Sequence, residues 1–359
     1  MRNKAVWIVL GVVVVAIIAI VAVQQTRQPK EKEIIRVGAI LPLTGSAASF
    51  GEVAKAGIDF GIEEIRGNRS INVEVFFEDS EANPQKAISS FRKLVYANKV
   101  DCIIATVYAV GMALRSEAEK SKTALLATVV APEFTKGTNY VLRHAPLITD
   151  DVRLVKETVV ETKLVDKQVA VVYQTDDYGR TFLEILGKEL RPKLAEGVDP
   201  KTTDFRSLVT KIRANNPNLV VVVGFGQWIG LLIKQLREQG YTGEIHASAG
   251  FMLTDAYLSA GDYAKGIWFN DLMIDEQSEK YIRFKEKFSS RFGRRLSKAS
   301  ILFYNWVMLI QECANHNKTT SDDMVEFLKS LGKYDTGIMK LSIDKNGEIV
   351  TPLIRRRFE

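Results

Sequence analysis

The chain has 359 residues, with 49 Lys and Arg against 43 Asp and Glu, a net charge of +6, and 46% hydrophobic residues. This composition is ordinary for a globular protein and excludes a disordered chain, a collagen and a small disulfide-rich scaffold. At about 100–200 residues per domain, the length predicts about two domains, each large enough to bury a core.

The only apolar run of membrane-spanning length is Ala5 to Val23, which lies behind Arg2 and Lys4. As a helix it would extend about 28 Å, close to the ~30 Å thickness of the hydrocarbon core. A cleaved signal peptide usually has a shorter apolar region of about 7–15 residues that ends in a small-x-small site. We therefore expect a membrane anchor followed by a polar stalk, together residues 1–33, with a cleaved signal peptide as the alternative.

Charge and cysteine content narrow the function further. Residues 1–33 hold five basic and two acidic side chains, so that half of the net charge of +6 belongs to this segment. The remainder is nearly neutral, which is not typical of a nucleic-acid-binding protein. Cys102 and Cys313 lie in apolar patterns, which favours buried free thiols over a disulfide. The three His are scattered, so the sequence predicts no metal site and no cofactor.

From Ile34 onward, short apolar strands alternate with amphipathic helices. Expected strands are Ile34–Leu41, Ile71–Phe77, Asp101–Ala105, Ala124–Val130, Gln168–Tyr173, Leu219–Val223 and Glu244–Ser248. Expected helices are Glu52–Arg66, Asn83–Asn98, Val110–Lys120, Val152–Thr162, Gly179–Leu194, Phe205–Ala214 and Trp228–Gln239. Strands separated by single helices predict parallel sheets covered on both faces, an α/β fold in two halves.

The last part of the chain has a different pattern. Three helices are expected at Glu276–Phe292, Lys298–Asn315 and Ser321–Leu331. Two strands follow, Gly337–Ile343 and Glu348–Phe358, joined by a turn that contains Asn346-Gly347, a strong hairpin signal.

Catalytic and nucleotide-binding motifs are weak. The loop Gly224 to Gly230 follows a strand and opens a helix, but its G-x-G-x-x-x-G spacing and the position of Glu244 at the start of the next strand differ from a dinucleotide fingerprint. Asp176 and Asp177 follow a strand, where they are interpreted either as a general acid/base pair or as helix-capping residues. Aromatic side chains also lie near strand ends, where an open α/β sheet forms its ligand crevice.

Four segments carry a family resemblance: IIRVGAILPLTGSAASFGEVAKAGIDFGIEEI, FFEDSEANPQKAISSFRKLV, VAVVYQTDDYGRTF and TDFRSLVTKIRANNPNLVVVVGFG. From Ile34 to the C-terminus the chain resembles the type 1 periplasmic binding proteins, and within them the leucine/isoleucine/valine-binding-like receptors of ABC transporters. The resemblance implies two Rossmann-like lobes joined by three hinge crossovers, with the ligand between them. We expect lobe 1 to comprise 34–147 and 276–334, and lobe 2 to comprise 148–275 and 335–359, which include the terminal hairpin.

The same resemblance implies the ligand-binding residues. Phe50, Tyr178 and Phe225 match aromatic positions of the family. Thr106 and Tyr108 replace its serine-rich helix start, Thr128 lies at its second turn, and Gly250 and Phe251 lie where amino-acid binders carry a carboxylate for the ammonium group.

That missing carboxylate guides the expected ligand. A buried ammonium group without a counter-charge is costly, so we expect an apolar or aromatic carboxylate, an amide or another neutral small molecule rather than an unmodified branched-chain amino acid. The expected function is an extracytoplasmic receptor, not an enzyme, which delivers its ligand to ABC permease subunits while Ala5–Val23 holds it to the membrane. The alternatives are a ligand sensor that acts through a separate signalling chain, and an enzyme that uses Asp176 or Asp177.

Overall fold

The computed structural model describes residues 34–359, apart from residues 46, 68–71, 164–168 and 189. Residues 35–359 form one compact unit. The expected membrane anchor, Ala5 to Val23, lies outside the described residues. Within the described part of the chain, no helix is both long enough and apolar enough to cross a bilayer.

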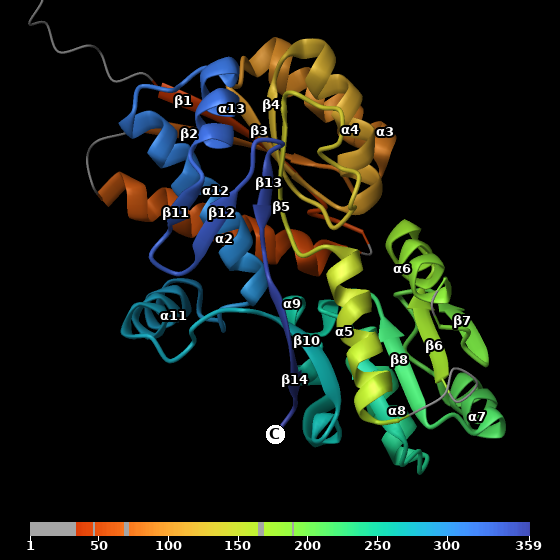
Figure 1. Ribbon diagram of the computed structural model, residues 1–359. Coiled ribbons are helices and arrows are strands. Elements are labelled where there is room, and N and C mark those ends of the chain that lie inside the picture. The colour runs from red at the N-terminus through yellow and green to blue at the C-terminus, as the bar shows by residue number, and fades with distance from the viewer. Residues whose placement is uncertain (1–33, 46, 68–71, 164–168, 189) are drawn as a thin grey trace, which may run out of the picture. The chain divides into compact units, whose positions relative to one another are not determined.

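Two sheets organise the fold, and each defines a lobe (Figure 1). The first lobe contains an eight-stranded sheet in the order β11-β12-β13-β5-β4-β3-β1-β2, in which β1, β3, β4, β5 and β13 pair in parallel. Its strands are β1 (Ile34–Leu41), β2 (Asn72–Asp79), β3 (Cys102–Thr106), β4 (Ala124–Thr128), β5 (Val141–His144), β11 (Lys333–Asp335), β12 (Lys340–Ile343) and β13 (Glu348–Val350).

The second lobe contains a six-stranded sheet in the order β14-β10-β9-β8-β6-β7. Every neighbouring pair is parallel except the edge pair β14–β10. Its strands are β6 (Val169–Gln174), β7 (Leu194–Val198), β8 (Leu219–Val223), β9 (Glu244–Ala247), β10 (Trp268–Leu272) and β14 (Leu353–Arg357).

Helices cover both faces of each sheet, as the continuous apolar strands predict. Along β6, Val169 and Val171 belong to the core beneath α5 and α6, whereas Ala170 and Val172 belong to the core beneath α7 and α8, because successive side chains of a strand point to opposite faces. The first lobe carries α2 (Ala48–Gly67), α3 (Pro84–Arg92), the π-helix η1 (Lys93–Asn98), α4 (Tyr108–Ser121), α11 (Glu279–Phe292), α12 (Lys298–Asn315) and α13 (Ser321–Ser330). The second lobe carries α5 (Ile148–Glu161), α6 (Asp177–Gly187), α7 (Arg206–Asn215), α8 (Trp228–Glu238), α9 (Gly250–Leu253), α10 (Tyr257–Ala260) and the 3₁₀ helix η3 (Gly261–Ala264).

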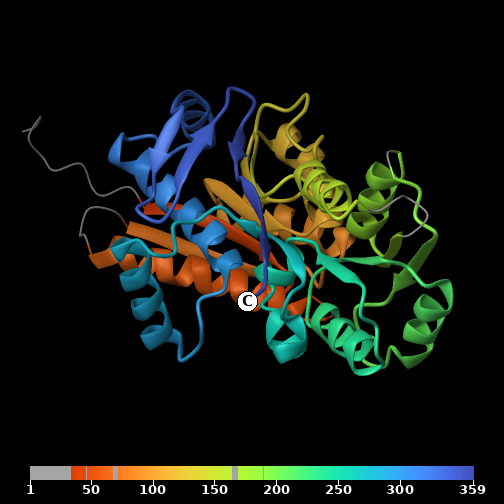
Figure 2. The same ribbon diagram turned by 60° about the horizontal axis from the view of Figure 1, so that its bottom comes forward.

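The chain passes between the sheets three times, as the family resemblance implies. The passages follow β5 at residues 145–147, follow β10 after Leu272, and join β13 to β14 at Thr351-Pro352. Figures 1 and 2 show the dark-blue C-terminal segment leaving the first sheet and ending in the second.

The terminal hairpin corrects the expected lobe boundaries. Both of its arms, β12 and β13, lie in the first sheet, and only β14 belongs to the second. The arms join the first sheet because Leu341, Ile343 and Ile349 are buried in its core and β13 pairs with β5. The expected strand Glu348–Phe358 is interrupted at Pro352, which has no N–H to donate to a sheet. Residues 335–350 therefore lie with the first lobe rather than the second.

Both cysteines lie in the core of the first lobe. Cys102 on β3 and Cys313 on α12 are buried free thiols, as their apolar surroundings predict. Burial raises the pKa of the Cys313 thiol to about 12, so this thiol is protonated and unreactive at neutral pH.

Candidate functional site

A cavity of about 430 Å³ lies where the two lobes face each other. Its walls come from the segments that follow β1, β3 and β4 in the first lobe and β6, β7 and β8 in the second. These are the carboxyl ends of parallel strands, where open α/β sheets bind ligands. Six of the eight predicted site residues line this cavity: Phe50, Thr106, Tyr108, Thr128, Tyr178 and Phe225.

Aromatic rings form a continuous wall that extends from one lobe to the other. The ring centroids of Tyr178 and Phe225 are 4.7 Å apart in the second lobe. Phe225 is in turn 6.0 Å from Phe50 of the first lobe, and Phe50 is 6.0 Å from Phe303 on α12. Because Phe50 and Phe225 are each half-buried, their exposed faces can enclose an apolar or aromatic group.

The start of α4 supplies hydrogen-bond donors at the same cavity. No side chain caps this helix, and no described residue accepts a hydrogen bond from the amides of Tyr108, Ala109 or Val110. Val107, which precedes the helix, has a φ of 74°, a strained value for a β-branched residue. Free amides and the positive end of the helix dipole together favour an anion such as a carboxylate.

The hydroxyl groups around this helix start are arranged differently from the sequence-based expectation. Thr106 donates to the carbonyl of Thr128 over 2.8 Å, and Tyr108 lies 3.0 Å from the carboxylate of Glu133, to which its hydroxyl donates. Neither proton is therefore free for a ligand. Thr128 Oγ1 accepts from Trp306 Nε1 over 3.1 Å, which leaves the Thr128 hydroxyl proton as the donor for the cavity.

Gly250 and Phe251 do not line the cavity, which corrects two of the predicted site residues. Phe251 is fully buried in the second lobe, where its ring packs against Phe269 and Phe358. A Cβ atom on Gly250 would lie 1.8 Å from the carbonyl oxygen of Gly224, so this glycine allows two backbone segments to approach closely.

The next turn of the chain reaches the cavity in their place. Leu253 and Thr254 line it at the end of α9. The family resemblance placed the contact one helical turn too early, because α9 is a four-residue helix that turns its first residues into the core.

Asp151 is a buried carboxylate that the sequence did not reveal. It lies on α5 behind Tyr178, whose hydroxyl donates to Asp151 Oδ2 over 3.1 Å. The backbone amide of Ala249 and the side-chain amide of Asn270 also donate to this carboxylate. Burial raises the pKa of Asp151 to about 6, against the lowering effect of these hydrogen bonds. The Tyr178 hydroxyl is thus engaged by Asp151, which leaves the aromatic ring as the part of Tyr178 available to a ligand in the cavity.

Asp176 acts as a helix cap, the structural alternative considered from the sequence. Its Oδ1 accepts from the amide of Gly179 over 2.9 Å, and its Oδ2 accepts from Gln174 Nε2 over 2.6 Å. Burial raises the pKa of the Asp176 carboxyl. Asp177 and Lys201 are exposed where they line the cavity.

The glycine-rich loop after β8 uses its own amides internally. The amide of Gly224 donates to Ser248 Oγ, that of Phe225 to Gln174 Oε1 and that of Gly226 to Thr254 Oγ1. A phosphate-binding loop would leave such amides free, so this loop instead holds Phe225 in the wall of the cavity.

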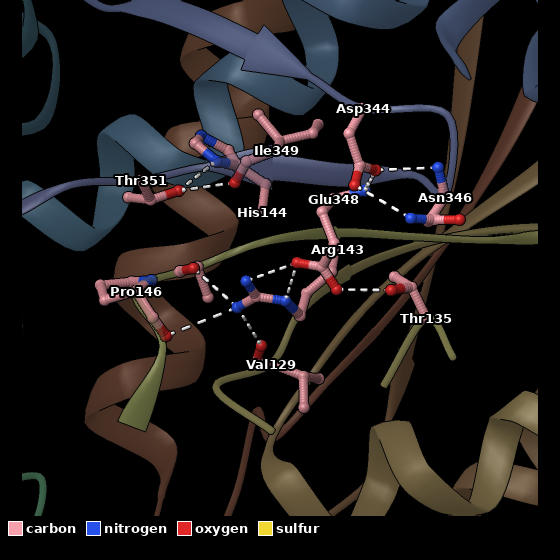
Figure 3. Close-up of polar contacts among 11 residues, drawn as sticks. Val129, Thr135, Arg143, His144, Pro146, Asp344, Asn346, Glu348, Ile349 and Thr351 are labelled. Carbon is pink, nitrogen blue, oxygen red and sulfur yellow. Dashed lines mark hydrogen bonds and ion pairs between the residues drawn. The ribbon is translucent and has the colours of Figure 1, made fainter. Parts of the chain in front are cut away.

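A buried ion pair joins β5 and β13, the strands that precede the first and the third passage between the lobes (Figure 3). Arg143 on β5 is 2% exposed, and its Nε donates to Glu348 Oε2 on β13 over 2.6 Å. Its Nη1 donates to the carbonyls of Val129 and Ala145, the second of which lies in the first passage. Thr135 also donates to Glu348, so the first passage and the strand before the third are held together on the first lobe.

Comparison with known proteins supports this geometry. Residues 34–354 match the sequence profile of a family described as periplasmic binding protein. An amino acid binding protein of Pseudomonas aeruginosa is 28% identical over 244 residues, which cover 64% of this chain and 65% of that protein.

Two solved structures have the same fold. LivJ from Streptococcus pneumoniae, in complex with isoleucine, has a TM-score of 0.80 at 20% identity and covers 91% of this chain and 96% of its own. A solute binding protein of an ABC transporter from Rhodopseudomonas palustris BisB5, in complex with 3,4-dihydroxy benzoic acid, has a TM-score of 0.80 at 21% identity, with 91% and 93% covered. The chain therefore belongs to the type 1 periplasmic binding protein family, in the branch of the Leu/Ile/Val-binding proteins.

Proposed function

We propose that this protein is an extracytoplasmic receptor that captures a small molecule between its lobes and delivers it to the permease of an ABC importer. The observation that carries the proposal is the interlobe cavity, which has an aromatic wall contributed by both lobes and unpaired helix amides at the start of α4. Ligand contacts to both lobes would stabilise a closed form that a permease can distinguish from the open form.

The chemistry of the cavity favours an apolar or aromatic carboxylate, or its neutral amide. The amides at the start of α4 and the Thr128 hydroxyl suit a carboxylate, and the rings of Phe50 and Phe225 suit an apolar body. The residues of the proposed site are therefore Phe50, Thr106, Tyr108, Thr128, Tyr178 and Phe225, with Leu253 and Thr254 added.

An unmodified branched-chain amino acid remains the less suitable ligand. Asp151 is the buried carboxylate nearest to Tyr178, but Tyr178, Ala249 and Asn270 already donate to both of its oxygens. An ammonium group would have to displace these donors in a buried environment, which is costly. Asp176 is likewise occupied by Gly179 and Gln174.

For the intact protein, we propose that Ala5 to Val23 anchors the chain, with Arg2 and Lys4 in the cytoplasm and the lobes outside. If the segment is cleaved, the same receptor is released from its anchor. Basic residues lie on both sides of the apolar run, Arg2 and Lys4 before it and Arg27, Lys30 and Lys32 after it, so charge does not decide the orientation. The proposed orientation rests on the outward position that a solute receptor requires.

Isothermal titration of the fragment from Ile34 to Glu359 tests the ligand class. Benzoate, benzamide and leucine serve as probes of an aromatic carboxylate, its neutral amide and an amino acid. We expect benzoate or benzamide to bind at least tenfold more tightly than leucine, a difference of about 1.4 kcal/mol or more. Micromolar or tighter binding of leucine would contradict the proposed selectivity, whereas failure of all three probes would require a wider screen of carboxylates and amides.

A further inference from the structure

A chain of buried hydrogen bonds runs from the edge of the second sheet to the ligand cavity. Its members lie on five different elements, and the sequence separates them by up to about 200 residues. In order, they are Arg355 on β14, Thr158 on α5, His246 on β9, Asn270 on β10, Asp151 on α5 and Tyr178 on α6.

Asp151, at one end of this series of hydrogen bonds, determines the orientation of Asn270 and, through it, which nitrogen of His246 carries the proton. Asn270 Nδ2 donates to the backbone carbonyl of Asp151 and to its Oδ1. The opposite orientation of this amide would place its oxygen against a carboxylate and a carbonyl, so the orientation is fixed. Asn270 Oδ1 therefore accepts from its other neighbour, His246 Nε2, at 2.9 Å.

His246 then has only one possible neutral tautomer. Its Nε2 carries the proton, so its Nδ1 accepts from the hydroxyl of Thr158 at 2.8 Å. The Thr158 oxygen in turn accepts from Arg355 Nη1 at 3.1 Å. Burial lowers the pKa of His246 to about 3, which keeps the ring neutral over the physiological range.

Arg355, at the other end of this series of hydrogen bonds, is also held in place. The Arg355 guanidinium is paired with Glu161 and lies over the ring of Trp268, with Cζ 4.5 Å from the ring centroid. Arg355 follows the third passage between the lobes, Asn270 precedes the second, and Asp151 follows the first. Each of the three passages between the lobes thus lies close in sequence to one member of this series of hydrogen bonds.

We propose that His246 is a positioning residue for the ligand cavity: as the Nε2–H tautomer, it orders the hydrogen bonds that hold the Tyr178 hydroxyl on Asp151. Without His246, Asn270 Oδ1 becomes a buried acceptor with no donor, so the amide group that donates to Asp151 is held at one end only. The Tyr178 ring, which forms part of the aromatic wall with Phe225, is then no longer held at its inner edge. The importance of His246 for ligand binding rests on the proposed function, but the test of its positioning role does not require a ligand.

Nuclear magnetic resonance of the full-length protein tests the proposal. The chain has three His, so a ¹⁵N-histidine spectrum is simple, and His246→Gln assigns the resonances of His246. We expect His246 to show the Nε2–H pattern and no titration between pH 7 and about pH 4. An Nδ1–H pattern at His246, or titration near pH 6, would overturn the proposal without any variant.

Two variants of His246 test the transmission to the cavity. Glutamine can accept from Thr158 and donate to Asn270, so His246→Gln preserves the order, whereas His246→Leu removes both contacts at similar bulk. In protein labelled at tyrosine ¹³Cζ, with Tyr178→Phe for assignment, we expect the Tyr178 resonance to shift in the leucine variant and to return to its original position in the glutamine variant. An unchanged Tyr178 resonance in folded His246→Leu protein would overturn the proposal, even if benzoate, benzamide and leucine all bind or all fail to bind.

Discussion

At the scale of the residue, close contacts decide which predicted side chains reach the cavity. Gly250 illustrates this, because its position was expected to contact ligand and instead lies against the backbone of Gly224. Gly187, at the end of α6, is the opposite case, since a Cβ atom there would meet no atom within 4 Å. The two glycines therefore have different physical roles.

These roles predict opposite effects of the same substitution. Gly250→Ala should lower the free energy of unfolding by about 2 kcal/mol or more, because a packed backbone must move to admit the methyl group. Gly187→Ala, its matched control, should raise that free energy by about 0.5–1 kcal/mol through better helix propensity. Urea unfolding of both variants measures the difference, and equal effects would show that Gly250 does not hold two backbone segments together.

At the scale of the element, the passages between the lobes are held by polar contacts within the protein interior. Arg143 and Glu348 connect β5 to β13, and His144 contacts Thr351 at 2.8 Å in the third passage (Figure 3). Burial lowers the pKa of His144 to about 3, so this contact involves a neutral ring. The passages thus begin from fixed points on the first sheet.

Removal of the buried Arg143 guanidinium should therefore lower the free energy of unfolding. Arg143→Met leaves the Glu348 carboxylate without its partner, and we expect a loss of about 3–5 kcal/mol in the free energy of unfolding. Arg153, which pairs with Glu157 on the exposed face of α5, is the control. Its replacement by Met should cost less than about 1 kcal/mol. Urea unfolding compares the two, and a small effect at Arg143 would contradict the role assigned to the pair.

At the scale of the whole molecule, three buried groups link stability to pH. His144 and His246 have pKa values lowered to about 3, so their contribution is complete above about pH 6.5 and is lost as the pH falls toward 3. Asp151 has a pKa raised to about 6, so its contribution is complete below about pH 3.8 and is lost as the pH rises through 6. A fall in pH therefore lowers the stability contributed by the two imidazoles and raises that contributed by the Asp151 carboxyl.

Between pH 4 and pH 6 the two imidazoles outweigh the one carboxyl. At these three groups the unfolded chain binds two more protons at the imidazoles and one fewer at Asp151, so together they contribute a fall of about 1.4 kcal/mol in the free energy of unfolding for each unit of decrease in pH. Asp151→Asn removes the opposing group and should steepen the measured slope by about 1.4 kcal/mol per unit relative to the parent protein. Urea unfolding at pH 4.5, 5.0 and 5.5 measures both slopes, and equal slopes in the two proteins would contradict this account.

Much of the architecture could be predicted from the sequence because local patterns carry it. The apolar runs at β6 and β8 indicated buried parallel strands, and the limits of α12 agree with those expected. The short strand β5 was missed because Arg143 and His144, half of its four residues, are polar yet buried. The alternation of exposed and buried residues in β7 was likewise too short to indicate a strand.

The candidate site was predictable only where a residue lies close to a recognisable motif. Phe50, Tyr178 and Phe225 adjoin such motifs, and they line the cavity. Asp151 has no local feature that separates it from half-buried Asp150, since the burial of Asp151 depends on Ala249 and Asn270, about 100 residues further along the chain. Long-range packing of this kind leaves no trace in a window of neighbouring residues.

The third passage determines how the two lobes can move. Only Thr351 and Pro352 separate β13 of the first sheet from β14 of the second. The ring of Pro352 fixes its φ, so few rotatable bonds remain in this connection. Because a two-residue connection cannot lengthen, β13 and β14 must keep a nearly constant separation when the lobes move. We therefore expect Thr351-Pro352 to act as a hinge between β13 and β14.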